Sequence, residues 1–158
     1  MIVLLAGTDI YSFQHTHPVK TIDSMERATV LISLHDLVHQ AIPKQFSDKL
    51  HVIYQSAQPV KVDLKNKKKW ITFVGKLNQA KGYDLFGKAV LKILKKYKQW
   101  KGIVIGDEPR STLIFKHKRL NVMGFTNHNK VLEIFKKTSI AVVCSRWNEP
   151  LGRSSLEA

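Results

Sequence analysis

The chain has 158 residues, of which 44% are apolar, and its 26 lysines and arginines outnumber 12 aspartates and glutamates for a net charge of +14. Such a chain forms one ordinary domain or two incomplete ones and buries about 68–70% of its unfolded surface, which excludes disorder as its main state. No apolar stretch reaches the roughly 18–20 residues that span a bilayer, and the opening MIVLLAG lacks the basic flank of a signal peptide, so we expect a cytoplasmic protein. The single cysteine, Cys144, excludes a disulfide within the chain, and we expect no metal site.

The charge is distributed unevenly about Pro59. Residues 1–59 contain four basic and five acidic side chains, whereas residues 60–158 contain 22 and 7, so the two parts carry net charges of −1 and +15. This abrupt change indicates two units, 1–59 and 60–158, joined near the lysine-rich segment 57–69. We interpret the lysine run as a solvated linker and not as a binding segment.

Three short apolar runs predict strands in the first unit. They are MIVLLAG at residues 1–7, TVLISL at 29–34 and LHVIYQ at 50–55. Continuous runs of this kind suit strands that are covered on both faces. The segments between them predict helices around Ile22 and His35. We place His15 and His17 in a flexible polar loop, which is a commoner setting for histidines than a metal or acid–base site.

Strands and helices alternate in the second unit. The expected strands are WITFVG at 70–75, GIVIG at 102–106 and SIAVVCS at 139–145, and the expected helices cover 83–97 and 129–137. In the first helix a face of lysines lies opposite apolar residues at helical spacing, namely Phe86, Ala89, Val90, Ile93, Leu94 and Tyr97. The alternation predicts an α/β fold with Rossmann-like, doubly wound parallel sheets.

Ligands of such sheets bind beyond the carboxyl ends of the strands. Lys76 and Lys81 share the loop after strand 70–75. Two lysines near a helix N-terminus suit a diphosphate, but taken alone they are more simply interpreted as ordinary loop lysines of a lysine-rich chain. After strand 139–145, Glu149 precedes Gly152, where the backbone can approach a ligand, and a helix begins around Arg153. We expect Glu157, one turn into that helix, to face the same cleft as Glu149, where carboxylates suit sugar hydroxyls.

Two spaced motifs resemble a known family. FVGKLNQAKGYDLF, followed about 70 residues later by SRWNEPLGRSSLEA, is similar to the donor-binding domain of the family 4 glycosyltransferases of the GT-B fold. Those enzymes carry a G-R/K-L…K-G loop and two glutamates eight residues apart. The resemblance covers roughly residues 70–158. The segments LLAGTDIY and KLHVIYQSA are similar to the end of the first GT-B domain, so we expect a chain truncated at both ends.

The resemblance implies retaining transfer of a sugar from a nucleoside diphosphate sugar, without a metal or another cofactor. It implies that Glu149 binds the transferred sugar and that Glu157 binds the ribose. Lys76 and Lys81 would neutralise the leaving pyrophosphate. The other donor-binding positions that it implies are Gly75, Leu151, Gly152 and Arg153. In the first unit, Asp9 stands where many relatives have a histidine. In the second unit, Gly106, Asp107 and Glu108 match the family's loop near the nucleotide base.

The implied partners are a nucleotide sugar and a carbohydrate or glycolipid acceptor, in the synthesis of cell-surface polysaccharide or glycolipid. The lysine face of helix 83–97 is compatible with peripheral contact at the anionic inner face of a membrane, and equally with a solvated surface. One alternative is an inactive nucleotide-sugar-binding fragment. A basic nucleic-acid-binding module is less favoured, because no aromatic-rich strand, RGG run or zinc motif accompanies the lysines.

Overall fold

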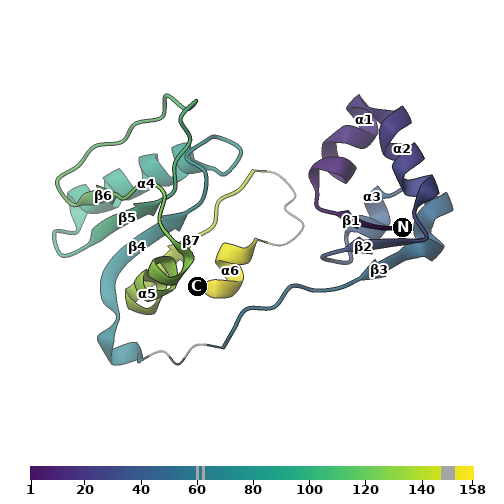
Figure 1. The fold of residues 1–158 in the computed structure, drawn as a ribbon. Coiled ribbons are helices and arrows are strands. Elements are labelled where there is room, and N and C mark those ends of the chain that lie inside the picture. Colours follow the sequence, from purple (N-terminus) through teal and green to yellow (C-terminus); the bar gives the residue numbers. More distant parts are fainter. Residues whose placement is uncertain (60, 62, 147–151) are drawn as a thin grey trace. The chain divides into compact units, whose positions relative to one another are not determined.

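The computed structural model describes residues 1–158 except residues 60, 62 and 147–151. The chain forms two compact units, one over Met1–Ser56 and one that begins at Ala57 (Figure 1). This division lies close to Pro59, where the charge distribution places the boundary. The assignment of the two units to the two GT-B domains remains a prediction.

The first unit contains a sheet of three parallel strands. In sheet order these are β1 (Ile2–Leu5), β2 (Val30–Ser33) and β3 (Leu50–Val52). All three lie within the apolar runs that predict strands, but each is shorter than its run. Leu5 and Leu31 are buried, whereas Ile2 and Leu4 of β1 are 68% and 51% exposed, because alternate side chains of a strand point to opposite faces.

The connection after β1 is helical. A π-helical turn (Asp9–Phe13) leads into α1 (Gln14–Thr16) and α2 (Pro18–Arg27), followed after β2 by α3 (Val38–Ala41) and a 3₁₀ segment (Lys44–Lys49). The helix expected around Ile22 is therefore present, and α3 follows His35. The flexible loop expected at His15 and His17 is wrong, because His15 lies in α1 and His17 directly precedes α2. Pro18, whose fixed φ suits the first turn of a helix, starts α2 at this point.

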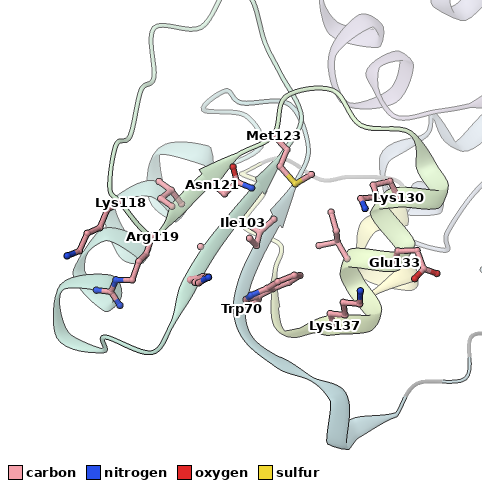
Figure 2. A pocket seen from close by; sticks show the side chains of 13 residues that line it. Trp70, Ile103, Lys118, Arg119, Asn121, Met123, Lys130, Glu133 and Lys137 are labelled. Atoms are coloured by element: carbon pink, nitrogen blue, oxygen red, sulfur yellow. The ribbon is translucent and has the colours of Figure 1, made fainter.

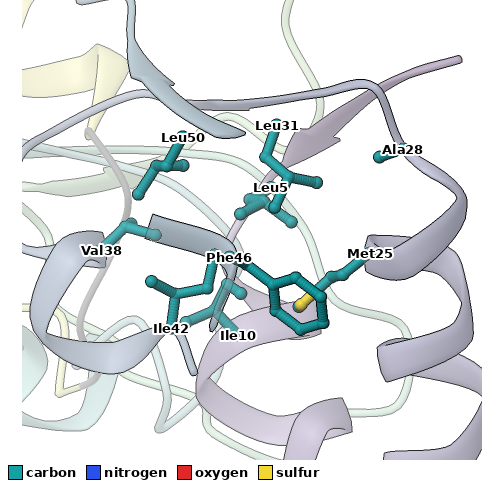
Figure 3. Packing of buried hydrophobic residues seen from close by; sticks show 9 residues of the cluster. All are labelled: Leu5, Ile10, Met25, Ala28, Leu31, Val38, Ile42, Phe46 and Leu50. Carbon is teal, nitrogen blue, oxygen red and sulfur yellow. The ribbon is translucent and has the colours of Figure 1, made fainter. Parts of the chain in front are cut away.

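A single hydrophobic cluster holds the first unit together (Figure 3). Its buried members are Leu5, Ile10, Met25, Ala28, Leu31, Val38, Ile42, Phe46 and Leu50. They come from all three strands and from the helical segments between them. Ile10 is fully buried, which anchors the π-helical turn to the sheet.

The second unit contains a sheet of four parallel strands in the order β6-β5-β4-β7. Their bounds are β4 (Lys68–Val74), β5 (Lys101–Ile105), β6 (Leu120–Val122) and β7 (Thr138–Val142). The parallel sheet expected from the sequence is confirmed. β4 begins two residues inside the predicted linker, so Lys68 and Lys69 belong to a strand and not to a linker. β6 was not predicted, because three residues are too short to show a periodicity.

Helices cover both faces of this sheet. α4 (Tyr83–Lys96) and α5 (His128–Lys137) belong to two separate hydrophobic clusters, and the chain also forms a 3₁₀ turn (Leu64–Asn66) and a short helix α6 (Arg153–Glu157). Val104 of β5 packs in the α4 cluster, whereas its neighbours Ile103 and Ile105 pack in the α5 cluster. This alternation shows that the sheet is doubly wound, as predicted.

The buried face of α4 is narrower than predicted. Phe86, Val90 and Leu94 are buried, as their helical spacing predicts, but Ala89 and Tyr97 are exposed. Tyr97 leaves the helical register because α4 ends at Lys96.

Candidate functional site

The loops that leave β4 and β5 are joined at the carboxyl edge of the second sheet. The N–H of Gly75 donates to the carbonyl of Ile105 at 3.0 Å, and the N–H of Leu77 donates to that of Asp107 at 3.4 Å. Because the strands are parallel and neighbours, their carboxyl ends meet at one edge, and these bonds continue the pairing into the loops. The loop with the two lysines therefore starts at the edge where the sequence places the ligand.

The lysine loop, residues 75–82, is folded on itself. Asn78 is its centre: its side-chain oxygen accepts from the N–H of Lys81 at 3.0 Å, and its carbonyl accepts from the N–H of Tyr83 at 3.1 Å. The aliphatic stem of Lys81 lies over Gly75, with its Cγ 3.9 Å from the place a Cβ would take there. Lys76 is exposed, and Lys81 is half-buried. Both lysines thus belong to one ordered loop at the start of α4.

Gly82 ends this loop where no other residue fits. Its φ is +72°, and a Cβ there would stand 1.9 Å from the carbonyl oxygen of Cys144, just beyond β7. The thiol of Cys144 also lies 3.2 Å from the carbonyl of Gly82. The lysine loop and the segment leaving β7 are therefore in direct backbone contact, and burial raises the pKa of the Cys144 thiol. This raised pKa agrees with the expectation that Cys144 is a small packing residue and not a nucleophile.

Arg146 makes the strongest link between these two segments. Its two terminal nitrogens each lie 2.6 Å from a carboxylate oxygen of Asp84 in the first turn of α4, and Nη1 also donates to the carbonyl of Gln79 at 2.9 Å. These bonds from Arg146 hold the pKa of the Asp84 carboxyl below its usual value. Neither residue is predicted from the sequence. Their signal was only that Arg146 stands just before the Glu149 motif and that Asp84 stands just after the lysine loop.

Helix α6 lies beside the end of β4, since the hydroxyl of Ser154 is 3.5 Å from the carbonyl of Val74. Glu157 has a side chain that is 10% exposed, and its Oε1 accepts from Arg153 Nη2 at 3.0 Å. The same oxygen lies 3.0 Å from Nε2 of His128 at the start of α5. Nothing in the sequence spacing indicated His128. The carboxylate that the resemblance assigns to ribose is thus held in place from two sides.

The predicted site residues are only partly brought together by the described structure. Gly75, Lys76 and Lys81 lie in the lysine loop at the end of β4, and Arg153 and Glu157 lie in α6 beside it. Glu149 and Leu151 lie outside the described residues, and Gly152 is half-buried.

Asp9 lies in the first unit, where its carboxylate accepts from the backbone N–H groups of Ala6, Gly7 and Ile10. Those contacts show Asp9 organising its own turn.

A polar pocket of about 370 Å³ lies next to the lysine loop. It is lined by Asn78, Gln79, Glu108, Arg110, Ser111, Thr112 and Leu113. Within it, Arg110 Nε donates to Glu108 at 2.9 Å and thereby lowers the pKa of that carboxyl, and the Asn78 amide donates to the same carboxylate at 3.4 Å. Glu108 is one of the three residues that the resemblance places near the nucleotide base, so this pocket adjoins the predicted donor site.

A second pocket, of about 550 Å³, lies on the α5 side of the same sheet (Figure 2). Lys130, Glu133 and Lys137 of α5 form one wall, and Trp70 and Ile103 lie between them and β6. None of the predicted site residues that the structure describes lines this pocket. Its basic rim is separate from the lysine loop and does not form part of the candidate site.

Among the described residues, no His, Cys, Asp and Glu side chains gather in threes or more as a metal site would require. The described helices also include none with the length and apolarity needed to cross a membrane.

The family model for glycosyl transferases group 1 matches residues 55–158. The chain belongs to this family. The match includes the lysine loop and α6. The resemblance to GT-B glycosyltransferases seen in the sequence is thereby confirmed. A comparison with curated protein sequences finds no match.

Solved structures of glycosyltransferases share the fold. A variant of TarM from S. aureus, solved with Fondaparinux, alpha-GlcNAc-glycerol and UDP, has a TM-score of 0.73 at 15% identity. HepE from Anabaena, solved with UDP and glucose, has a TM-score of 0.74 at 16% identity, and WaaG, a glycosyltransferase of lipopolysaccharide biosynthesis, has 0.66 at 16%. Each comparison covers 99% of this chain but only 34%, 49% and 53% of the respective relative. The chain thus spans about a third to a half of the length of these proteins.

Proposed function

We propose that the chain is part of a retaining glycosyltransferase that takes its sugar from a nucleoside diphosphate sugar. The observation that carries the proposal is the family match over residues 55–158, whose lysine loop and α6 lie at the carboxyl end of β4. In doubly wound sheets this edge is where ligands bind. The acceptor is a carbohydrate or glycolipid of cell-surface synthesis.

Two groups of side chains divide the work of donor binding in this proposal. Lys76 and Lys81 lie against the diphosphate and stabilise the negative charge that grows on it as the sugar leaves, which a preorganised cation does without a metal. The carboxylate of Glu157 accepts hydrogen bonds from the hydroxyls of the ribose. Its contacts with His128 and Arg153 support this role because they orient the carboxylate. A carboxylate has about four lone-pair positions, so it can accept hydrogen bonds from ribose hydroxyls in addition to these two contacts. Glu149 binds the hydroxyls of the transferred sugar.

Uridine diphosphate is the first nucleotide to test. The TarM variant and HepE structures both contain UDP. Titration calorimetry of the chain with UDP, GDP and ADP should give saturable heat with one of them. Lys81→Ala should weaken that binding about 10–150-fold, the range for a lost hydrogen bond to a charged group. Lys88→Ala, which removes an exposed lysine of α4, is the matched control and should leave the affinity unchanged. No saturable heat with any nucleotide contradicts the proposal.

The cellular place of this activity is part of the proposal. We place the enzyme in the cytoplasm, in peripheral contact with an anionic membrane through the lysine face of α4. Lys88, Lys92, Lys95 and Lys96 are exposed on that helix, which supports an electrostatic contact. An inactive binder of nucleotide sugars is the alternative, and it predicts nucleotide binding without any sugar transfer in a full-length context.

A further inference from the structure

We infer that Arg146 is a positioning residue for the diphosphate site, acting through the lysine loop. The inference rests on the proposed function and adds a residue to it. Arg146 contacts both sides of that loop: its guanidinium pairs with Asp84 after the loop, and it also donates to the carbonyl of Gln79 within it. Its backbone N–H donates to the carbonyl of Ala80 at 2.8 Å.

The geometry is that of a clamp and not of a loose surface pair. The two parallel bonds to Asp84 use the fork of the guanidinium, which fixes the orientation of both groups. The side chain of Asp84 is 11% exposed, and that of Arg146 is 40% exposed. The clamp therefore connects three segments to one another: the first turn of α4, residues 79 and 80 of the loop, and the segment leaving β7.

Lys81 is the residue that this clamp would place. It directly follows Ala80, whose carbonyl accepts from Arg146, and it precedes Gly82, which touches Cys144. A displacement of the segment 79–82 would therefore move Lys81 relative to Gly75 and to the diphosphate. Because catalytic and binding groups must be held within a fraction of an ångström, a loosened loop should cost affinity even if the lysine remains.

A second arginine that contacts the same helix, α4, is a matched control. Arg119 binds the opposite end of α4, where it donates to the carbonyls of Leu94, Tyr97 (2.8 Å) and Trp100 (3.2 Å). Its removal should loosen α4 without touching the lysine loop. Any effect that comes only from a weakened helix should therefore be the same in Arg119→Gln and in Arg146→Gln.

The experiment measures UDP affinity by calorimetry and the amide hydrogen exchange of the peptide 75–82 in the whole chain. Arg146→Gln should weaken UDP binding about tenfold and accelerate exchange in that peptide, whereas Arg119→Gln should stay within about twofold of wild type in both. Arg146→Lys keeps the charge but loses the fork, so it should recover only part of the affinity. Circular dichroism shows whether each variant is folded, and Arg146→Lys remains informative if Arg146→Gln is not.

Three results would overturn the inference while leaving the proposed function in place. They are wild-type affinity in Arg146→Gln, full affinity in Arg146→Lys, and an equal loss in Arg119→Gln. The second would mean that only the charge of Arg146 matters, and the third that a weakened α4 explains the loss. Absence of UDP, GDP and ADP binding by the wild-type chain is a different result, which removes the proposed function and this inference with it.

Discussion

Replacing Gly82 by alanine tests the contact between the lysine loop and the segment leaving β7. The backbone at Gly82 has a φ of +72°, which costs a residue with a Cβ about 1–2 kcal/mol. The new Cβ would also stand 1.9 Å from the carbonyl oxygen of Cys144, so the backbone must shift, and overpacking of this kind costs about 1–3 kcal/mol. We expect a total loss of about 2–5 kcal/mol in the unfolding free energy of the second unit.

Gly124→Ala separates the two contributions. Gly124 has a similar φ of +69°, but a Cβ there meets nothing within 4 Å, so only the conformational cost applies. Urea unfolding followed by circular dichroism should therefore show Gly82→Ala less stable than Gly124→Ala by about 1–3 kcal/mol. In thermal melts each kcal/mol corresponds to about 4–8 °C for a unit of roughly 100 residues. Equal stability of the two variants would refute the close approach of Gly82 and Cys144.

Three further predictions address binding, acid stability and the surface charge. Glu157→Ala should weaken nucleotide binding in calorimetry by about 1–3 kcal/mol, because ribose hydroxyls lose their acceptor. Glu133→Ala, on the exposed surface of α5, should leave nucleotide binding unchanged, and equal effects of the two variants would remove the ribose role of Glu157. Asp84 has a pKa below 3.8 in the folded chain because Arg146 donates to it, so its stabilisation is present above about pH 3.8 and is lost as the pH falls through the lowered pKa. Asp84→Asn should therefore flatten the acid part of the stability profile from urea unfolding, and an unchanged slope would contradict the pairing. In vesicle sedimentation, replacing Lys88 with glutamate should reduce binding to anionic vesicles at low salt, since each lysine near such a surface is worth about 1 kcal/mol; equal pelleting with neutral vesicles would remove the membrane contact.

The fold of the second unit was largely predictable, because its strands and α4 repeat a local pattern. The apolar runs 70–75, 102–106 and 139–145 correspond to β4, β5 and β7. Phe86, Val90 and Leu94, which recur at helical spacing, form the buried face of α4. Such patterns are visible in a short window of sequence, since they depend on which side chains one element buries. The helical conformation at His15 could not be predicted in the same way, because it depends on the burial of Ile10 together with the start of α2 at Pro18.

The candidate site was predicted by residue type and by resemblance, but its internal contacts were not. The motif pointed to Lys76, Lys81, Arg153 and Glu157, and the described structure places their backbones around the end of β4. The Arg153–Glu157 pair has the i, i+4 spacing of a single helix, but the motif did not indicate that His128 of α5 would also hold Glu157. A contact between side chains on two separate helices leaves no periodic trace in either of them.

The sequence by itself therefore determined the fold class and the family, since each follows from local patterns and spaced motifs, and it predicts a site at the carboxyl edge of the second sheet. Only the tertiary structure decided how the lysine loop is held. Arg146 and Asp84 are 62 residues apart, and the parallel pairing of β4 with β7 brings the segments that follow these strands together. The positive φ of Gly82 would by itself favour glycine at this position. Only the tertiary structure shows that the carbonyl of Cys144 also leaves no room for a side chain there.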